Sequence, residues 1–73
     1  MASYTEEMTV YELLKVAADH DKQLMVLTEE EIQDLIVLLK QKGEEQLEHG
    51  QEIEVEGVRL VKRVTGAVGV YFK

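Results

Sequence analysis

The chain of 73 residues contains no cysteine and no proline, and each absence excludes a class of protein. Without cysteine, neither a disulfide framework nor a zinc site with thiolate ligands can stabilise so small a domain. Without proline, a proline-rich linker or recognition peptide is excluded. No apolar run approaches the ~20 residues of a membrane-spanning helix, and the first nine residues lack the apolar segment of a signal peptide. We therefore expect a cytoplasmic protein that does not bind membranes.

Residues that could carry catalysis are also scarce. The only serine is Ser3, and no serine–histidine–aspartate or cysteine–histidine arrangement is available for nucleophilic catalysis. His20 stands between Asp19 and Asp21, but a solvated helix end explains this cluster better than a metal site does. The chain has no phosphate-binding glycine loop, calcium loop or zinc-protease motif. We expect no catalytic residue, no metal, no cofactor and thus no enzyme.

Basic residues are few, since 15 acidic residues stand against 8 lysines and arginines, for a formal charge of −7. This balance argues against direct binding of nucleic acid, which requires cationic side chains to displace counterions. It argues equally against docking on anionic lipid. The acidity is concentrated in residues 1–50, which hold 12 acids and 4 bases, whereas residues 51–73 hold 3 acids and 4 bases.

Two amphipathic helices are predicted after a flexible tail over residues 1–8. The pairs Thr9/Glu12 and Thr28/Glu31 both have the spacing of a capping box, in which hydroxyl and carboxylate cap each other's backbone amides. Apolar residues follow each pair at helical spacing and predict helices over 10–20 and from 29 onward. The predicted buried stripes are Val10, Leu13, Leu14, Ala17 and Ala18, then Ile32, Leu35, Ile36 and Leu39. Between the helices, residues 23–27 form either a brief strand or an extended connector.

The end of the second helix depends on Gly43. Glycine costs ~1 kcal/mol inside a helix, and Lys40 and Lys42 suit the negative end of a helix dipole. We therefore expect a break or kink at Gly43 and a short extra turn over 44–49. The alternative is one helix that continues toward Gly50.

After Gly50 the apolar period changes from 3.6 to 2, which predicts three antiparallel strands over 51–56, 58–64 and 67–72. A two-residue turn at Glu56-Gly57 pairs Ile53 with Leu60 and Glu54 with Arg59. One face of the sheet then carries Ile53, Val55, Val58, Leu60 and Val64. An odd number of residues in the second turn, around Gly66, adds Val68, Val70 and Phe72 to this face, whereas an even number places them opposite.

The predicted fold class is α+β, with two to three N-terminal helices followed by a short antiparallel hairpin or meander. The chain forms a single domain over 1–73, helical over 9–50 and in strands over 51–73. Domains of this size often need a partner copy for stability. Apolar side chains outside the main face predict a homodimer; they are Val37, Val61 and Tyr71.

The helices carry most of the acids on their predicted outer surface: Asp19, Asp21, Glu29, Glu30, Asp34, Glu44, Glu45 and Glu48. Such a surface can compete for the basic groove of a nucleic-acid-binding protein through steering and complementary potential. The simpler interpretation is an acidic domain whose charges keep it dispersed.

In size, acidity and lack of active-site motifs, the chain resembles the small host-takeover proteins of bacteriophages. These include acidic DNA mimics that block histone-like nucleoid proteins. The resemblance implies an inhibitor that acts in the host cytoplasm, as a dimer, by covering the DNA-binding surface of a basic host protein. Because residues 29–49 concentrate seven acids against two bases, the predicted partner-binding residues are Glu29, Glu30, Asp34, Glu44, Glu45 and Glu48.

Two other functions stay open. The first is an inhibitor or adaptor of a host enzyme such as RNA polymerase, acting through the apolar side chains of Val37, Val61 and Tyr71. The second is a small dimeric regulator with winged-helix-like topology. In that regulator Arg59, Lys62 and Arg63 would contact phosphate, although three acids over 44–49 rule out DNA binding through the helix there.

Overall fold

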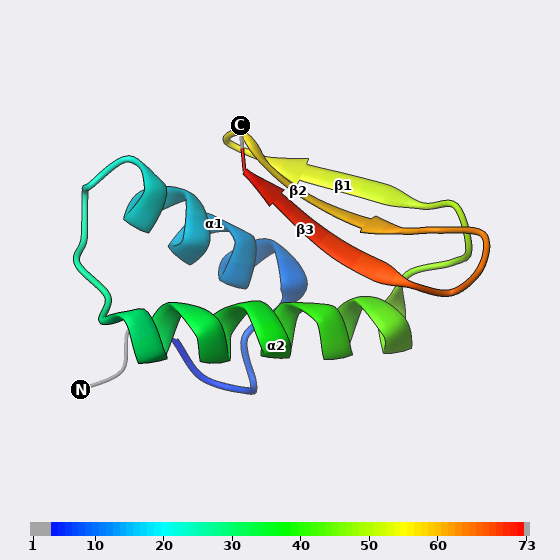
Figure 1. Ribbon diagram of the computed structural model, residues 1–73, viewed down its shortest axis with the longest axis horizontal. Coiled ribbons are helices and arrows are strands. Elements are labelled where there is room, and N and C mark those ends of the chain that lie inside the picture. Colours follow the sequence, from blue (N-terminus) through cyan, green and yellow to red (C-terminus); the bar gives the residue numbers. More distant parts are fainter. Residues whose placement is uncertain (1–3, 73) are drawn as a thin grey trace.

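The computed structural model describes residues 4–72, and these form two helices followed by three strands (Figure 1). The helices are α1 (Val10–Asp21) and α2 (Glu29–Gln46), and the strands are β1 (Glu52–Val55), β2 (Val58–Lys62) and β3 (Val68–Phe72). The strands form one antiparallel sheet in the order β1-β2-β3. The predicted α+β class is confirmed, with two helices and a meander.

Both predicted capping boxes are present. The Thr9 hydroxyl accepts from the Glu12 amide at 3.2 Å, and the Glu12 carboxylate accepts from the Thr9 amide at 3.0 Å. Thr28 and Glu31 repeat the exchange at 3.1 Å each way, and the bond from the Thr28 backbone lowers the pKa of Glu31. Two of the four free amides at each helix start are thereby satisfied.

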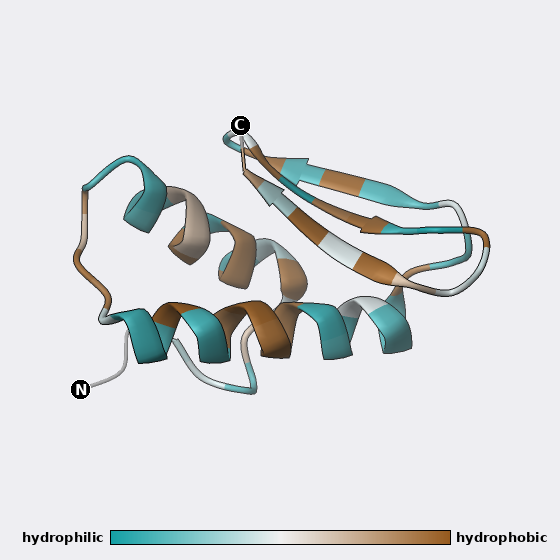
Figure 2. Ribbon diagram, viewed as in Figure 1, coloured by the Kyte–Doolittle hydropathy of each residue, from teal (hydrophilic) through white to brown (hydrophobic). Residues whose placement is uncertain are grey.

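The helices pack on one face of the sheet, with α1 against β1 and β2 and α2 against β2 and β3 (Figure 1). The alternation of apolar and polar residues along β1 is visible in Figure 2. One hydrophobic core lies between the two layers. Its fully buried side chains are Leu13, Leu14, Leu35, Leu39, Val58 and Leu60.

The predicted register of the hairpin is confirmed, because Ile53 pairs with Leu60 and Glu54 pairs with Arg59. Glu56 and Gly57 form the turn with φ of 48° and 95°, the positive pair that a two-residue hairpin of type I′ requires. Residues 23–27 form a turn and an extended connector without a strand.

The second turn spans residues 63–67, an odd number, so the apolar residues of β3 face the helices as the odd-loop alternative predicts. One residue assigned to that face is wrong. Val64 is 78% exposed, because β2 ends at Lys62 and the chain has already turned away from the helices.

The expected break at Gly43 is also wrong, because α2 continues through it to Gln46 and residues 44–49 form no separate turn of helix. Gly43 is buried against the sheet. A Cβ built on it would lie 2.8 Å from Val68 Cγ1 and 3.4 Å from Leu60 Cδ2. The glycine is therefore a close-packing residue, and the contact with the sheet offsets the local cost of glycine in a helix.

Residues 4–8 of the predicted tail lie against α2, and residues 1–3 of that tail fall outside the described range. The Tyr4 hydroxyl donates to the carbonyl of Glu31 at 2.9 Å. Tyr4 and Met8 are half-buried and pack against the core. The segment is thus tied to the side of α2.

Candidate functional site

The acidic residues predicted to bind a partner do not all share one surface. At 100° per residue, Glu30, Asp34 and Glu44 project from the side of α2 opposite its buried Leu35 and Leu39. We name this the outer face of α2, formed by Glu30, Asp34, Val37, Gln41, Glu44 and Glu45. Of the remaining predicted residues, Glu29 lies on the flank of the helix, and Glu48 lies beyond its end.

The carboxylates of the outer face are exposed, and no ion pair within residues 4–72 involves them. Lys40, on the flank of α2, is the nearest base by helical position. The structure therefore brings four of the six predicted partner-binding residues onto one acidic strip along α2, with Glu30 and Asp34 near its start and Glu44 and Glu45 near its end.

The N-terminal segment and α2 form an open groove of about 360 Å³ that includes Asp34, Val37 and Gln41 of the outer face. Its lining combines the carboxylates of Glu6 and Asp34 with the apolar side chains of Val37 and Leu38. Burial, and then the charges of Asp34 and Glu31, raise the pKa of the nearby Tyr4 hydroxyl. The groove thus combines acidic and apolar side chains, and sequence periodicity alone gave no sign of it.

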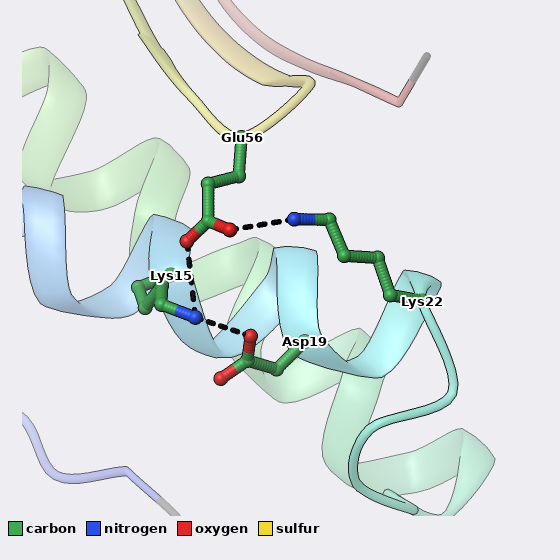
Figure 3. A network of polar contacts seen from close by, with 4 residues as sticks. All are labelled: Lys15, Asp19, Lys22 and Glu56. Carbon is green, nitrogen blue, oxygen red and sulfur yellow. Dashed lines mark hydrogen bonds and ion pairs between the residues drawn. The ribbon is translucent and has the colours of Figure 1, made fainter.

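Two basic residues of the helical part, Lys15 and Lys22, form ion pairs away from α2, as Figure 3 shows. The Glu56 carboxylate in the β1–β2 turn pairs with Lys22 at 2.6 Å and with Lys15 at 3.0 Å. Lys15 also pairs with Asp19. The contact with Lys22, followed by that with Lys15, lowers the pKa of Glu56, and the bonds to Asp19 and Glu56 raise the pKa of Lys15.

This network corrects one expectation, because Asp19 is neutralised locally and does not belong to the free acidic surface. It also consumes two of the four bases in residues 1–50 on the side of α1 that faces the hairpin turn. The other two bases of this region, Lys40 and Lys42, lie on α2 outside its outer face, and neither forms an ion pair within residues 4–72.

The open face of the sheet carries a cluster of arginines around Tyr71. The Arg59 guanidinium lies 5.8 Å from the centre of the Tyr71 ring, and Arg63 Nη2 donates to the Tyr71 hydroxyl at 2.8 Å. Arg59 forms its ion pair with Glu52, at 3.2 Å, and not with its register partner Glu54. The ring of Tyr71 covers Gly69, whose added Cβ would lie 2.8 Å from the hydroxyl.

The side chains predicted to form a dimer interface lie on two separate surfaces. Val37 is on the outer face of α2, whereas Val61 and Tyr71 are on the sheet face that points away from the helices. A twofold interface uses the same patch on both copies. One such interface therefore cannot bury all three side chains, and they form no continuous apolar patch for another protein.

Lys62 has a role that our sequence reasoning missed. Its side chain is 9% exposed, and Nζ donates to the carbonyls of Glu44 at 2.8 Å and Leu47 at 3.1 Å. The ammonium thus caps the C-terminus of α2, where a cation is favoured. The alternation of the strand could have revealed this role, because Lys62 lies two residues after the buried Leu60 and therefore points to the same face of the sheet. The prediction that Lys62 contacts phosphate is wrong.

Among the described residues, no three histidine, cysteine, aspartate or glutamate side chains approach closely enough to hold a metal ion. No helix in residues 4–72 is both long and apolar enough to cross a bilayer. The chain matches no protein-family model, no curated protein and no solved structure. Its surface chemistry is therefore what bears on function.

Proposed function

We propose that the protein is a non-enzymatic inhibitor whose acidic outer face of α2 docks on the DNA-binding surface of a basic, nucleoid-associated protein. The observation that carries the proposal is the strip of exposed carboxylates without ionic partners in residues 4–72. Solvent screens such charges only weakly once a partner excludes water from them. A complementary basic groove would then gain both association rate and specificity from the strip.

The charge density of the strip sets how closely it can imitate DNA. The strip holds four acids between Glu30 and Glu45, and at 1.5 Å per residue this segment of helix is about 24 Å long. This corresponds to one net charge per ~6 Å, against one per ~1.7 Å along duplex DNA. The strip thus replaces only part of the phosphate charge. Its binding should weaken with salt, but less steeply than the binding of duplex DNA to the same partner.

Two variants with equal net charge test the location of the site. The triple change E30Q, D34N and E44Q neutralises the outer face of α2. The control set E7Q, D21N and E54Q removes three exposed acids elsewhere. Both variants keep the capping boxes and the Glu56 network intact, so a difference between them reports the position of the charges and not their number.

The assay follows the displacement of a fluorescent DNA duplex from a purified bacterial histone-like nucleoid protein. We expect the unmodified protein and the control variant to displace the duplex with similar half-effective concentrations. The outer-face variant should need at least tenfold more. Failure of the unmodified protein to displace the duplex, or equal loss in both variants, contradicts the proposal. So does an affinity that stays flat between ~50 and ~300 mM salt.

A further inference from the structure

The outer edge of β3 can be located from the hydrogen bonds of β2. Lys62 turns both backbone groups toward β1, since its amide donates to the carbonyl of Gln51 at 2.9 Å and its carbonyl accepts from the Gly50 amide at 2.7 Å. Its neighbour Arg63 turns the other way and donates to the carbonyl of Ala67 at 2.8 Å. Ala67 is therefore a residue whose backbone polar groups face β2.

Because alternate residues of a strand direct their backbone groups to opposite sides, Gly69 and Tyr71 also face β2. Val68, Val70 and Phe72 then present their amides and carbonyls to the outer edge of the sheet. Within residues 4–72, no strand lies beyond β3 and no backbone partner engages these groups. The outer edge of β3 thus offers the unpaired amides and carbonyls of three residues to another strand.

The two edges of the sheet differ in protection. The edge strand β1 has four residues, two of which, Glu52 and Glu54, carry charge. A helix packs against each edge strand, α1 on β1 and α2 on β3, so the difference lies in the strands' own side chains. Strand β3 has five residues without a charge or a proline. Edge strands are normally shielded by charged side chains, proline or a covering element. Strand β3 lacks such side chains, so its edge suits the addition of another strand.

We propose that β3 pairs antiparallel with β3 of a second copy, about a twofold axis at Val70. The sequence of β3 is self-complementary in this register. Val70 meets Val70 of the second copy, each Val68 meets a Phe72, and each Gly69 meets a Tyr71. The outward backbone groups of all three exposed residues are then satisfied on both copies, and the two sheets become one.

The side chains fit the same register. On the helix-facing side, Phe72 is 39% exposed at the end of the core, and pairing places it beside Val68 of the second copy. On the open side, the ring of Tyr71 already covers Gly69 within one copy, and pairing places each Tyr71 opposite a glycine of the second copy, so no bulky side chain opposes it across the new strand pair. A second copy therefore suits this edge better than an arbitrary extended peptide does.

The proposed dimer does not depend on the proposed function, and salt separates the two. Each copy carries a formal charge of −7, so the copies repel each other and screening should strengthen the dimer. Binding of a basic protein through the outer face of α2 should weaken under the same change. If either dimer formation or binding of the basic protein fails, the other can still be tested independently.

The test compares V70P with V70A, because both shorten the apolar side chain and only proline removes the amide. The Val70 amide faces outward, so proline breaks no hydrogen bond within one copy. Sedimentation equilibrium in high salt should give dimers for the unmodified protein and V70A. The V70P dimer should dissociate at least tenfold more readily, with an unchanged circular dichroism spectrum as evidence of folding.

Amide exchange on the unmodified protein gives a second measurement that needs no variant. In the dimer, the amides of Val68, Val70 and Phe72 should be protected along with those of Gly69 and Tyr71. In a monomer, only the last two should be. A protein that remains monomeric at millimolar concentration overturns the proposal, as does a dimer that survives in V70P or leaves the three outward amides unprotected.

Discussion

The cap that Lys62 places on α2 leads to a quantitative prediction for the change K62M. Methionine keeps the length and packing of the side chain but removes both donors to the carbonyls of Glu44 and Leu47. Hydrogen bonds from a charged donor are worth about 1.5–3 kcal/mol each. Removing a buried charge returns part of that amount as relief of its desolvation cost. We expect a net loss of about 3 kcal/mol in the free energy of unfolding.

A loss of this size is a large fraction of the ~4–11 kcal/mol expected for a domain of this length. It should lower the melting temperature by at least ~10 °C, since 1 kcal/mol corresponds to about 4–8 °C in small domains. Urea unfolding followed by circular dichroism measures the free energy, and thermal unfolding measures the midpoint. K40M is the matched control, because it removes the same charge from an exposed position of α2.

The control should change stability by no more than ~0.5 kcal/mol. If K62M were as stable as K40M, the two carbonyls would not depend on the ammonium. The C-terminus of α2 would then be held by packing of Leu47 alone. A large loss in both variants would instead point to a general effect of net charge on this acidic chain.

Two further predictions concern packing and pH. G43A should lower the free energy of unfolding by about 1 kcal/mol. Alanine favours the helix by ~1 kcal/mol, but the new methyl group overlaps Val68, and overpacking costs ~1–3 kcal/mol. In a V68A background the same change should stabilise the protein, and urea unfolding of the four proteins tests this reversal of sign. Lys22 and Lys15 lower the pKa of Glu56, so its contribution is present above its unfolded pKa and is lost as pH falls through the lower folded pKa. E56Q should therefore flatten the acid side of a stability–pH profile at low salt, whereas an unchanged profile would show that the pairs contribute nothing.

The strands could be predicted closely because their determinants are local. The turn at Glu56-Gly57 needs two positive φ angles and therefore fixes the register of the residues on either side. Alternation then assigns every side chain to a face. The loop over 63–67 was ambiguous by one residue, and the apolar content of Val68 and Val70 selects the odd length, since only that length buries them under the helices.

The predictions that were wrong concern positions whose conformation depends on residues distant in the sequence. Helix propensity places a break at Gly43, but the energy of that position depends on how closely Leu60 and Val68 approach it, and these residues follow it in another layer. Tertiary contacts routinely override propensity of this size. Val64 was misplaced for a related reason: strand parity holds only while the strand continues, and nothing in the local sequence marks its end at Lys62.

Helical periodicity could place acidic residues on the outer surface, but it could not identify which of them are neutralised. Asp19 forms an ion pair with Lys15, one turn earlier in the helix, and the spacing of the two residues allows this pair without requiring it. The groove beside Val37 depends on residues 4–8 returning along α2. This return is held by one long-range bond from Tyr4 and by packing of Tyr4 and Met8 against the core, and no periodic signal encodes it.

The proposed strip and the proposed edge can operate in one assembly. Strand β3 would associate through its edge, in the plane of the sheet, while the outer face of α2 points away from the sheet and stays accessible. A dimer would then present two acidic strips and a formal charge twice that of one copy. A basic partner with twofold symmetry would bind both strips, and the second contact would benefit from a high effective concentration. The uncharged edge of β3 therefore has a consequence for the acidic face, because it converts a strip with modest charge density into a bivalent one.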